Sequence, residues 1–233
     1  TPRDLPRFEE LLGDGSAWGL SIEYAEQSEP RGIAEAFLLG EAFIDGEPVC
    51  LILGDNVFYG QGLSGKLQAA AALRAGGRVF GYPVKDPERY GVVDFGPDGD
   101  VRAIIEKPGV PPSPYAVTGL YFLDGTAPDR AVEVTPSARG ELEITSLLES
   151  YLRDGALEVQ RMGRGFAWLD TGTHGSLLDA ANFVRTLTER QGMQTGSPDE
   201  IAYAQGWITA EELRERIGLF TKNAYGEYLN SLL

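Results

Sequence analysis

Two aspartates each follow an apolar run that is typical of a β-strand. Asp55 follows VCLILG, and Asp170 follows FAWL. Ligands of open α/β sheets bind at the carboxyl ends of the strands, and carboxylates there can hold Mg²⁺, whose other ligands are waters and substrate phosphates. The alternative for Asp55 is a cap on the next turn, and position alone does not decide between the two. For Asp170 alone, the pattern favours an N-cap, from Asp170 or Thr173, on a helix that begins near His174.

Polar residues beside these aspartates and in the segment IIEKPG extend the candidate site. Gly54 has no side chain, so a ligand could approach its backbone closely, and Asn56 follows Asp55 directly. Glu106 and Lys107 end a predicted strand just before a proline. Lysine suits a phosphate group, and glutamate can accept hydrogen bonds from sugar hydroxyls. The alternative is an exposed ion pair at a turn.

Composition excludes several classes of function. The net charge of −15 argues against a nucleic-acid polymer or an anionic membrane as partner, and no apolar stretch approaches the roughly 20 residues of a membrane helix. Cys50 and His174 are the single cysteine and histidine, too few for a disulfide or a zinc site. Without a GxSxG motif there is no serine-hydrolase nucleophile elbow. A reducing, cytoplasmic setting is therefore expected.

The candidate residues need a scaffold, and the periodicity predicts an α/β fold. Strands are expected at 20–25, 49–56 and 78–84, with helices between them at 33–44 and 62–77. This βαβ order predicts a Rossmann-like mixed, mostly parallel sheet flanked by helices, with 49–56 buried on both faces. A β-hairpin around GPDGD, a strand at 115–123, a helix at 140–155 and short strands at 156–162 and 166–170 follow.

Both ends of the chain are predicted to be helical. A short capped helix is expected before Gly13, and helical signals continue from residue 173 to the C-terminus. SPDE and TAEE resemble helix starts with a capping residue followed by acids. The predicted division is a core at 1–190 and a small C-terminal helical annex at 191–233.

Taken in order, several segments resemble the sugar-1-phosphate nucleotidyltransferases. The resemblance rests on the joint order and spacing of PRFEELLGDGSAWG, QSEPRGIAEAF, LGDNVFYG, DPERYGVVDF, EKP, YAVTGLYF, PSARGELEIT, MGRGFAWLDTGTH and ERQG. It implies a Mg²⁺-dependent in-line displacement, in which glucose 1-phosphate attacks the α-phosphate of dTTP and pyrophosphate leaves. Such catalysis is positioning and charge neutralisation, without a covalent intermediate.

The resemblance also implies roles for individual residues. Asp55 and Asp170 would hold Mg²⁺, and Lys107 would contact the sugar phosphate, with Arg139 near it. The thymine base would meet Gln27 and Gly32, and Trp168 would form a wall of the site near Asp170. The residues expected to line the glucosyl pocket are Asn56, Tyr90, Gly91, Glu106 and Val117.

The chain departs from the family pattern at its start. The family begins with a strand and a glycine-rich loop of the form GGxGTRLxPxT, which cradles the triphosphate on backbone N–H groups. The sequence begins with TPRDLPRF instead, about 50 residues into the pattern, or more than one βαβ unit. We therefore expect the sequence to be a fragment that is inactive as written. The alternative is a non-catalytic nucleotide-sugar-binding protein that has lost the loop.

Further expectations follow from the resemblance. Glu29 and Arg31 stand where more neutral residues are expected near the base, so dTTP is favoured and UTP stays open. The product would serve deoxysugar biosynthesis of the dTDP-rhamnose type. The C-terminal helices would support a homotetramer and a second, regulatory nucleotide site, to which Tyr59 and Gly60 would contribute.

Overall fold

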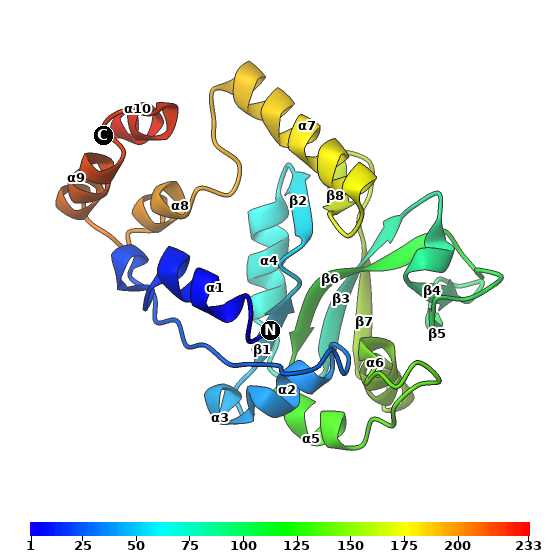
Figure 1. Ribbon diagram of the computed structural model, residues 1–233. Helices are drawn as coiled ribbons and strands as arrows, with labels where there is room; N and C mark the ends of the chain where they lie inside the picture. The colour runs from blue at the N-terminus through cyan, green and yellow to red at the C-terminus, as the bar shows by residue number, and fades with distance from the viewer. The chain divides into compact units, whose positions relative to one another are not determined.

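The chain divides into two compact units, whose ribbons are drawn in Figure 1. Each unit has a hydrophobic core of its own. The computed structural model describes residues 1–233. Unit 1 comprises residues 1–28 and 174–233, and unit 2 comprises residues 29–173. The boundary differs from the one expected near residue 190, because residues 174–190 and the first 28 residues belong with the C-terminal helices.

Unit 2 is built on a six-stranded mixed sheet. Its strands are β1 (Val49–Ile52), β3 (Gly77–Pro83), β4 (Gly91–Phe95), β5 (Val101–Glu106), β6 (Tyr115–Leu123) and β7 (Leu157–Arg161). The order is β5-β4-β6-β3-β7, and β1 also pairs with β6. The α/β class with a mixed sheet flanked by helices is therefore confirmed.

The expectation of a mostly parallel sheet was wrong. Only β3 and β7 pair in parallel, whereas every other strand pair is antiparallel. β1 and β3 do run in the same direction, as the βαβ pattern requires, but β6 lies between them and is antiparallel to both. The aromatic and β-branched run of β6 predicts a strand but carries no signal for its place in the sheet.

Strand β1 was also expected to be buried on both faces, and it is not. Cys50 is exposed, and Ile52 has 61% of its surface exposed. β1 pairs with β6 along one edge and with no other strand. An apolar run of four to eight residues does not by itself distinguish these two surroundings.

Unit 2 also contains a separate two-stranded sheet. It consists of β2 (Asn56–Gly60) and β8 (Phe166–Asp170), which pair antiparallel. The register sets Asn56 opposite Asp170. Segments more than 100 residues apart therefore meet at the aspartates predicted to bind metal.

Helices cover both faces of the main sheet of unit 2. On one face, α2 (Glu35–Leu39), α5 (Ala127–Val132) and α6 (Ile144–Arg153) form a core with inward-facing strand residues. On the other face, α4 (Leu63–Ala71) packs with Phe80, Leu120, Phe122 and Met162. Alternate strand residues point to opposite faces, which is why Val79 belongs to the first core and Phe80 to the second. A short helix, α3 (Glu41–Ile44), follows α2.

The β4–β5 hairpin and the segment before α6 carry several residues of the candidate site. β4 and β5 form the predicted hairpin, and a short 3₁₀ helix, η2 (Pro87–Arg89), leads into it. Helix α6 begins at Ile144 rather than at residue 140, because Glu143 has extended backbone (φ −72°, ψ 137°). Glu141 and Glu143 therefore lie before the helix.

Unit 1 is helical. Its elements are α1 (Leu5–Leu12), the 3₁₀ helix η1 (Ser16–Trp18), α7 (His174–Gln191), α8 (Pro198–Ala204), α9 (Ala210–Leu219) and α10 (Ala224–Asn230). The caps predicted at SPDE and TAEE are confirmed: Ser197 accepts from the backbone N–H of Glu200, and Thr209 forms a capping box with Glu212. The cap predicted for the first helix is not formed, because the side chain of Asp4 bonds to no backbone N–H of α1.

The expected strand at 20–25 is absent. The segment pairs with no strand, and Ile22 instead packs against the core around Trp18 and Leu213. Its alternating pattern thus serves packing rather than sheet formation. Neither unit has a helix with the length and apolar character needed to cross a lipid bilayer.

Candidate functional site

A cavity of about 350 Å³ in unit 2 brings together most of the predicted site residues. We call it the site cavity. Ten predicted residues line it: Asp55, Asn56, Tyr90, Gly91, Glu106, Lys107, Val117, Arg139, Trp168 and Asp170. They come from the β1–β2 turn, the β4–β5 hairpin, β6, the loop before α6, and β8. The other lining residues are Ile33, Leu53, Arg89, Gly119, Tyr121, Glu141, Glu143, Ile144, Thr145 and Gly172.

Three predicted residues do not line the site cavity. Gln27 belongs to unit 1. Gly32 has φ +107°, and a Cβ there would lie 2.3 Å from the carbonyl oxygen of Leu142, so close backbone approach explains the glycine. Gly54 has open space around an added Cβ, so packing does not require a glycine there.

The pairing of β2 with β8 brings Asp55 and Asp170 to the same end of two strands. Asn56 lies opposite Asp170, and the carbonyl oxygen of Asp55 accepts hydrogen bonds from Thr171 N (2.9 Å) and Thr171 Oγ1 (3.0 Å). The side chain of Asp55 accepts from Asn56 Nδ2 (2.6 Å) and caps no backbone N–H. The turn-cap alternative for Asp55 therefore has no support, and Asp55 is one of the residues that line the site cavity.

Asn56 is itself fixed by two further elements. Its Oδ1 accepts hydrogen bonds from Trp168 Nε1 (2.6 Å) and from the backbone N–H of Gly119 (3.1 Å). A Cβ at Gly119 would lie 2.6 Å from that oxygen, so only glycine allows the approach. The orientation of Asp55 thus depends on residues from β6 and β8.

Asp170 is held by two residues at the start of the hairpin. The Tyr90 hydroxyl donates to Asp170 Oδ2, and Arg89 Nη2 lies 3.5 Å from the same oxygen. Burial, followed by the hydrogen bond to Asp170, raises the pKa of Tyr90, so its hydroxyl stays protonated and can donate. The ring of Tyr90 packs edge-to-face on Trp168 at 5.2 Å.

The two aspartates fit a Mg²⁺ site completed by substrate. No group of three or more His, Cys, Asp or Glu side chains forms a ready-made metal site. Mg²⁺ is commonly bound by one or two carboxylates together with waters and substrate phosphates. Two carboxylates from Asp55 and Asp170, both lining the site cavity, supply donors of that kind.

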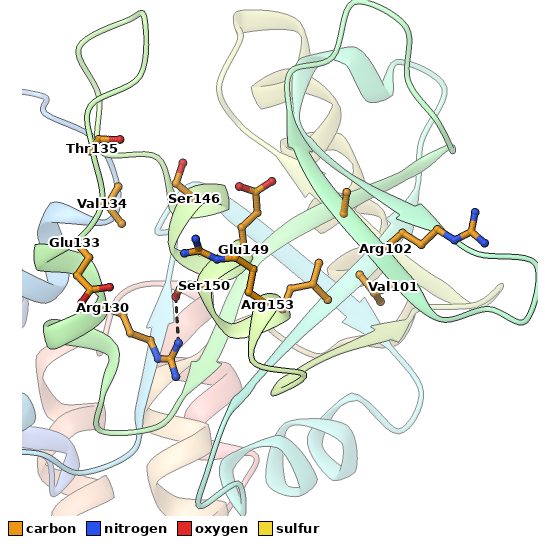
Figure 2. Close-up of a pocket in the computed structure, with 12 residues that line it drawn as sticks. Val101, Arg102, Arg130, Glu133, Val134, Thr135, Ser146, Glu149, Ser150 and Arg153 are labelled. Carbon is orange, nitrogen blue, oxygen red and sulfur yellow. Dashed lines mark hydrogen bonds between the residues drawn. The ribbon is translucent and has the colours of Figure 1, made fainter.

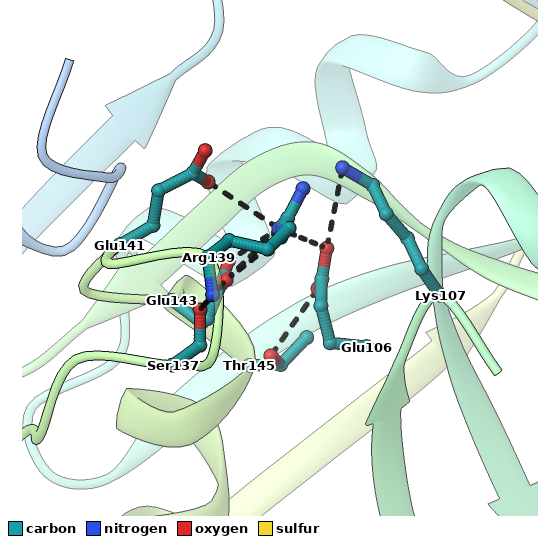
Figure 3. Close-up of polar contacts among 7 residues, drawn as sticks. All are labelled: Glu106, Lys107, Ser137, Arg139, Glu141, Glu143 and Thr145. Atoms are coloured by element: carbon teal, nitrogen blue, oxygen red, sulfur yellow. Dashed lines mark hydrogen bonds and ion pairs between the residues drawn. The ribbon is translucent and has the colours of Figure 1, made fainter.

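Charged residues from β5 and the loop before α6 form the other wall (Figure 3). Arg139 Nη2 lies 3.3 Å from Glu106 Oε1, 3.3 Å from Glu141 Oε2 and 2.9 Å from Glu143 Oε2. Lys107 Nζ lies 3.8 Å from Glu106 Oε1. Burial, with a smaller contribution from Glu143, raises the pKa of Glu106. The ion pair of Glu106 and Lys107, which was the alternative to a binding role, is present, but both residues line the site cavity.

Lys107 has an unusual backbone conformation. Its φ of +42° places a residue with a full side chain in the left-handed region. Its N–H donates to the carbonyl oxygen of Tyr90 at 3.0 Å, which ties the end of β5 to the start of β4. Conformations of this kind concentrate at functional sites, where the surrounding structure holds them.

The lining of the site cavity is acidic overall. It contains five carboxylates (Asp55, Glu106, Glu141, Glu143 and Asp170) and three cations (Arg89, Lys107 and Arg139), which gives a formal balance of −2. A substrate that carries several phosphates would be repelled by this balance unless a further cation enters with it.

A larger cavity of about 600 Å³ lies between β5, α5 and α6, and no predicted site residue lines it (Figure 2). Its most enclosed cation is already committed. Arg130 forms an ion pair with Asp154 (2.8 Å), donates to Ser150 Oγ (3.3 Å) and lies over the ring of Tyr151. Ten of the predicted site residues therefore line the site cavity, and none lines this larger one.

Sequence reasoning missed three charged residues of the site cavity, namely Arg89, Glu141 and Glu143. Arg89 stands beside the predicted Tyr90 in the segment DPERYG. Glu141 and Glu143 are two residues apart in GELE, so an extended backbone would direct both to one side. The expected helix at 140–155 hid that signal, since a helix would separate them by about 200°.

Comparison with known proteins identifies the family of the chain. Residues 1–186 match the Nucleotidyl transferase family. The chain is 54% identical, over 232 residues, to a glucose-1-phosphate thymidylyltransferase from Xanthomonas campestris pv. campestris (strain B100), covering 100% of this chain and 79% of the relative. It is 48% identical, over 233 residues, to one from Mycobacterium tuberculosis (strain CDC 1551 / Oshkosh), covering 100% and 81%.

A solved structure gives the same result. It is assigned as a Bacillus anthracis glucose-1-phosphate thymidylyltransferase in complex with sucrose. It superposes with a TM-score of 0.72 at 35% identity, covering 83% of this chain and 75% of that one. Sequence relatives, matched residues and fold agree, and the chain belongs to the nucleotidyl transferase family of enzymes.

Proposed function

We propose that this chain carries the sugar-phosphate side of a glucose-1-phosphate thymidylyltransferase site. A phosphate oxygen of glucose 1-phosphate would attack the α-phosphorus of dTTP, and the bond from that phosphorus to the bridging oxygen would break. The products would be dTDP-glucose and pyrophosphate. The names of the relatives support this reaction.

One observation carries the proposal. The site cavity sets two carboxylates, Asp55 and Asp170, on one wall and two cations, Lys107 and Arg139, on another. Phosphoryl chemistry of this type needs positioned charges rather than a covalent nucleophile. Asp55 and Asp170 would hold Mg²⁺, which would supply positive charge to offset the negative charge of the phosphates during the transfer.

The chain's own residues would bind and orient the sugar phosphate. Lys107 and Arg139 would meet the phosphate as cations. Glu106, half-buried and fixed by Thr145 Oγ1 (3.2 Å), would accept hydrogen bonds from sugar hydroxyls. Tyr90 and Asn56 would act mainly on Asp170 and Asp55, since their polar groups already bond to those carboxylates.

The test is pyrophosphate release by the gene product that contains this chain. With dTTP, glucose 1-phosphate and Mg²⁺, we expect turnover, and Asp55→Ala should lower kcat by at least about a thousandfold because it removes half of the metal's protein ligands. The matched control is Asp94→Ala, which removes a carboxylate that does not line the site cavity. Normal activity of Asp55→Ala would exclude the metal assignment.

The same assay separates the alternatives. A higher kcat/KM with UTP than with dTTP would assign a uridylyltransferase. No turnover, together with calorimetric binding of dTDP-glucose, would assign a nucleotide-sugar-binding protein. Under the proposal, the product would feed deoxysugar biosynthesis in the cytoplasm, and the protein would elute as a homotetramer from a sizing column.

A further inference from the structure

Arg139 is held unequally by the three carboxylates around it (Figure 3). With Glu143 it makes a two-pronged contact, in which Nη2 lies 2.9 Å from both carboxylate oxygens and Nε lies 3.2 Å from Oε1. With Glu106 and Glu141 it makes one contact each, at 3.3 Å. Bidentate contacts fix the plane of a guanidinium, whereas single contacts do not.

Burial and support distinguish Glu143 further. The side chain of Glu143 is 9% exposed, compared with 37% for Glu141. Ser137 Oγ donates to Glu143 Oε1 at 2.6 Å and accepts from the backbone N–H of Arg139 at 3.2 Å. Glu143 is thus fixed from behind by the same loop that carries Arg139.

We propose that Glu143 is a positioning residue for anion binding, which holds Arg139 toward the site cavity for a phosphate group. The contacts to Glu106 and Glu141 are those that Arg139 exchanges for phosphate oxygens. The identification of the phosphate as that of a sugar 1-phosphate rests on the function proposed above.

The two glutamates are therefore expected to act in opposite directions. Glu141 adds negative charge beside Arg139 without fixing it, so it opposes an incoming anion. Glu143 also adds negative charge, but its loss would free the guanidinium and leave the ordering of Arg139 to the ligand, at a cost in conformational entropy. If net charge alone decided affinity, removing the charge of either glutamate would tighten phosphate binding.

The experiment measures binding by calorimetry with two probes, glucose 1-phosphate and inorganic phosphate. We expect Glu143→Gln to weaken binding of both about tenfold, because it removes the charge-assisted hydrogen bonds that fix the guanidinium of Arg139. Glu141→Gln should instead tighten binding about two- to threefold at low salt, an effect that salt screens. Opposite signs from two carboxylates on one arginine support positioning, and tightening by both overturns it.

Controls separate positioning from folding. Glu158→Gln breaks a comparable contact, in which Arg78 Nε and Nη2 bond to Glu158 Oε2 at 2.9 and 2.7 Å outside the site cavity, and phosphate affinity should not change. If Glu143→Gln does not fold, Ser137→Ala removes the hydroxyl behind Glu143 and should weaken binding about threefold, by the loss of one hydrogen bond. Unchanged affinity in a folded Ser137→Ala variant would then count against the proposal.

Binding of inorganic phosphate can be measured without turnover, so it tests the positioning role independently of the proposed reaction. Weaker phosphate binding by Glu143→Gln, without any pyrophosphate release by the wild type, would support positioning and reject the proposed function. A wild-type chain that binds neither probe would overturn both.

Discussion

Two arginines of this chain are bound by carboxylates in opposite surroundings. In unit 1, Arg216 Nε lies 2.7 Å from Asp199 Oδ1, and Asp199 is only 2% exposed. That carboxylate also accepts from Trp18 Nε1 (3.2 Å) and the Tyr225 hydroxyl (2.7 Å). One anion meets one cation and two neutral donors, so the Asp199 cluster is closed and balanced.

In unit 2, Arg139 meets three carboxylates and is itself 40% exposed. Its cluster has more negative groups than cations, and two of its contacts are single and open to the site cavity. The Asp199 cluster is buried and its charges balance, so its role is structural. The Arg139 cluster has excess negative charge and is accessible, so Arg139 can exchange carboxylate contacts for contacts with a ligand.

The largest expected effect on stability comes from removing Asp199 from its cluster. Asp199→Ala should lower the free energy of unfolding of unit 1 by about 3–5 kcal/mol, because it leaves Arg216 enclosed without its anion. Trp18 Nε1 and the Tyr225 hydroxyl would lose an acceptor at the same time. Urea denaturation followed by circular dichroism and tryptophan fluorescence measures the change. A loss below about 1 kcal/mol would place Asp199 with surface charges rather than with buried ones.

A smaller effect, of opposite sign, is expected from the open cluster. The pKa of Glu106 is raised, first by burial and then by Glu143, against the lowering effects of Lys107, Thr145 and Arg139. The folded state therefore binds this proton more tightly than the unfolded state does, so ionised Glu106 costs stability above its folded pKa. Glu106→Gln should stabilise the chain at pH 7 by less than about 1 kcal/mol.

The pH dependence checks this sign. As pH falls through the raised pKa of Glu106, the carboxylate of the wild type becomes protonated and the wild type regains stability. The difference in free energy of unfolding between Glu106→Gln and the wild type should therefore shrink, and vanish by about pH 4, near the pKa of an unfolded glutamate. Urea midpoints of the two proteins at a series of pH values provide the measurement. A stabilisation that grows as pH falls would reject the assignment.

The two regions were not equally predictable from sequence. The caps of α8 and α9 were readable, because Ser197 and Thr209 act on residues three positions away. The partners of Asp199 were not, since Trp18 is 181 residues away and no local pattern encodes that contact. In the site cavity, Asp55 and Lys107, which lie on different walls, were predicted from strand ends and resemblance. Glu143 was hidden by the late start of α6.

The sheet shows the same limit. The turn signal at GPDGD predicted β4 and β5, and the aromatic and β-branched run predicted β6. Pairing order depends on non-local contacts, so the place of β6 between β1 and β3 was missed. The segment at 20–25 alternates like a strand and forms none, because packing of Ile22 in unit 1 uses the same pattern. Periodicity indicates which side of a segment is buried. Whether the segment forms a strand depends on the segments that pack or pair with it.

The smallest expected effect tests whether burial alone makes the difference. Arg185 and Glu189 form an i,i+4 pair in α7 with Nε and Oε1 3.5 Å apart, and both side chains are more than 60% exposed. Water solvates each group almost as well as its partner does, so Arg185→Gln should change the free energy of unfolding by no more than about 0.5 kcal/mol. Gln keeps the helix propensity close to that of Arg, which limits other causes. The same urea titration serves, and a loss comparable to that of Asp199→Ala would show that ion pairing itself, rather than enclosure, stabilises unit 1.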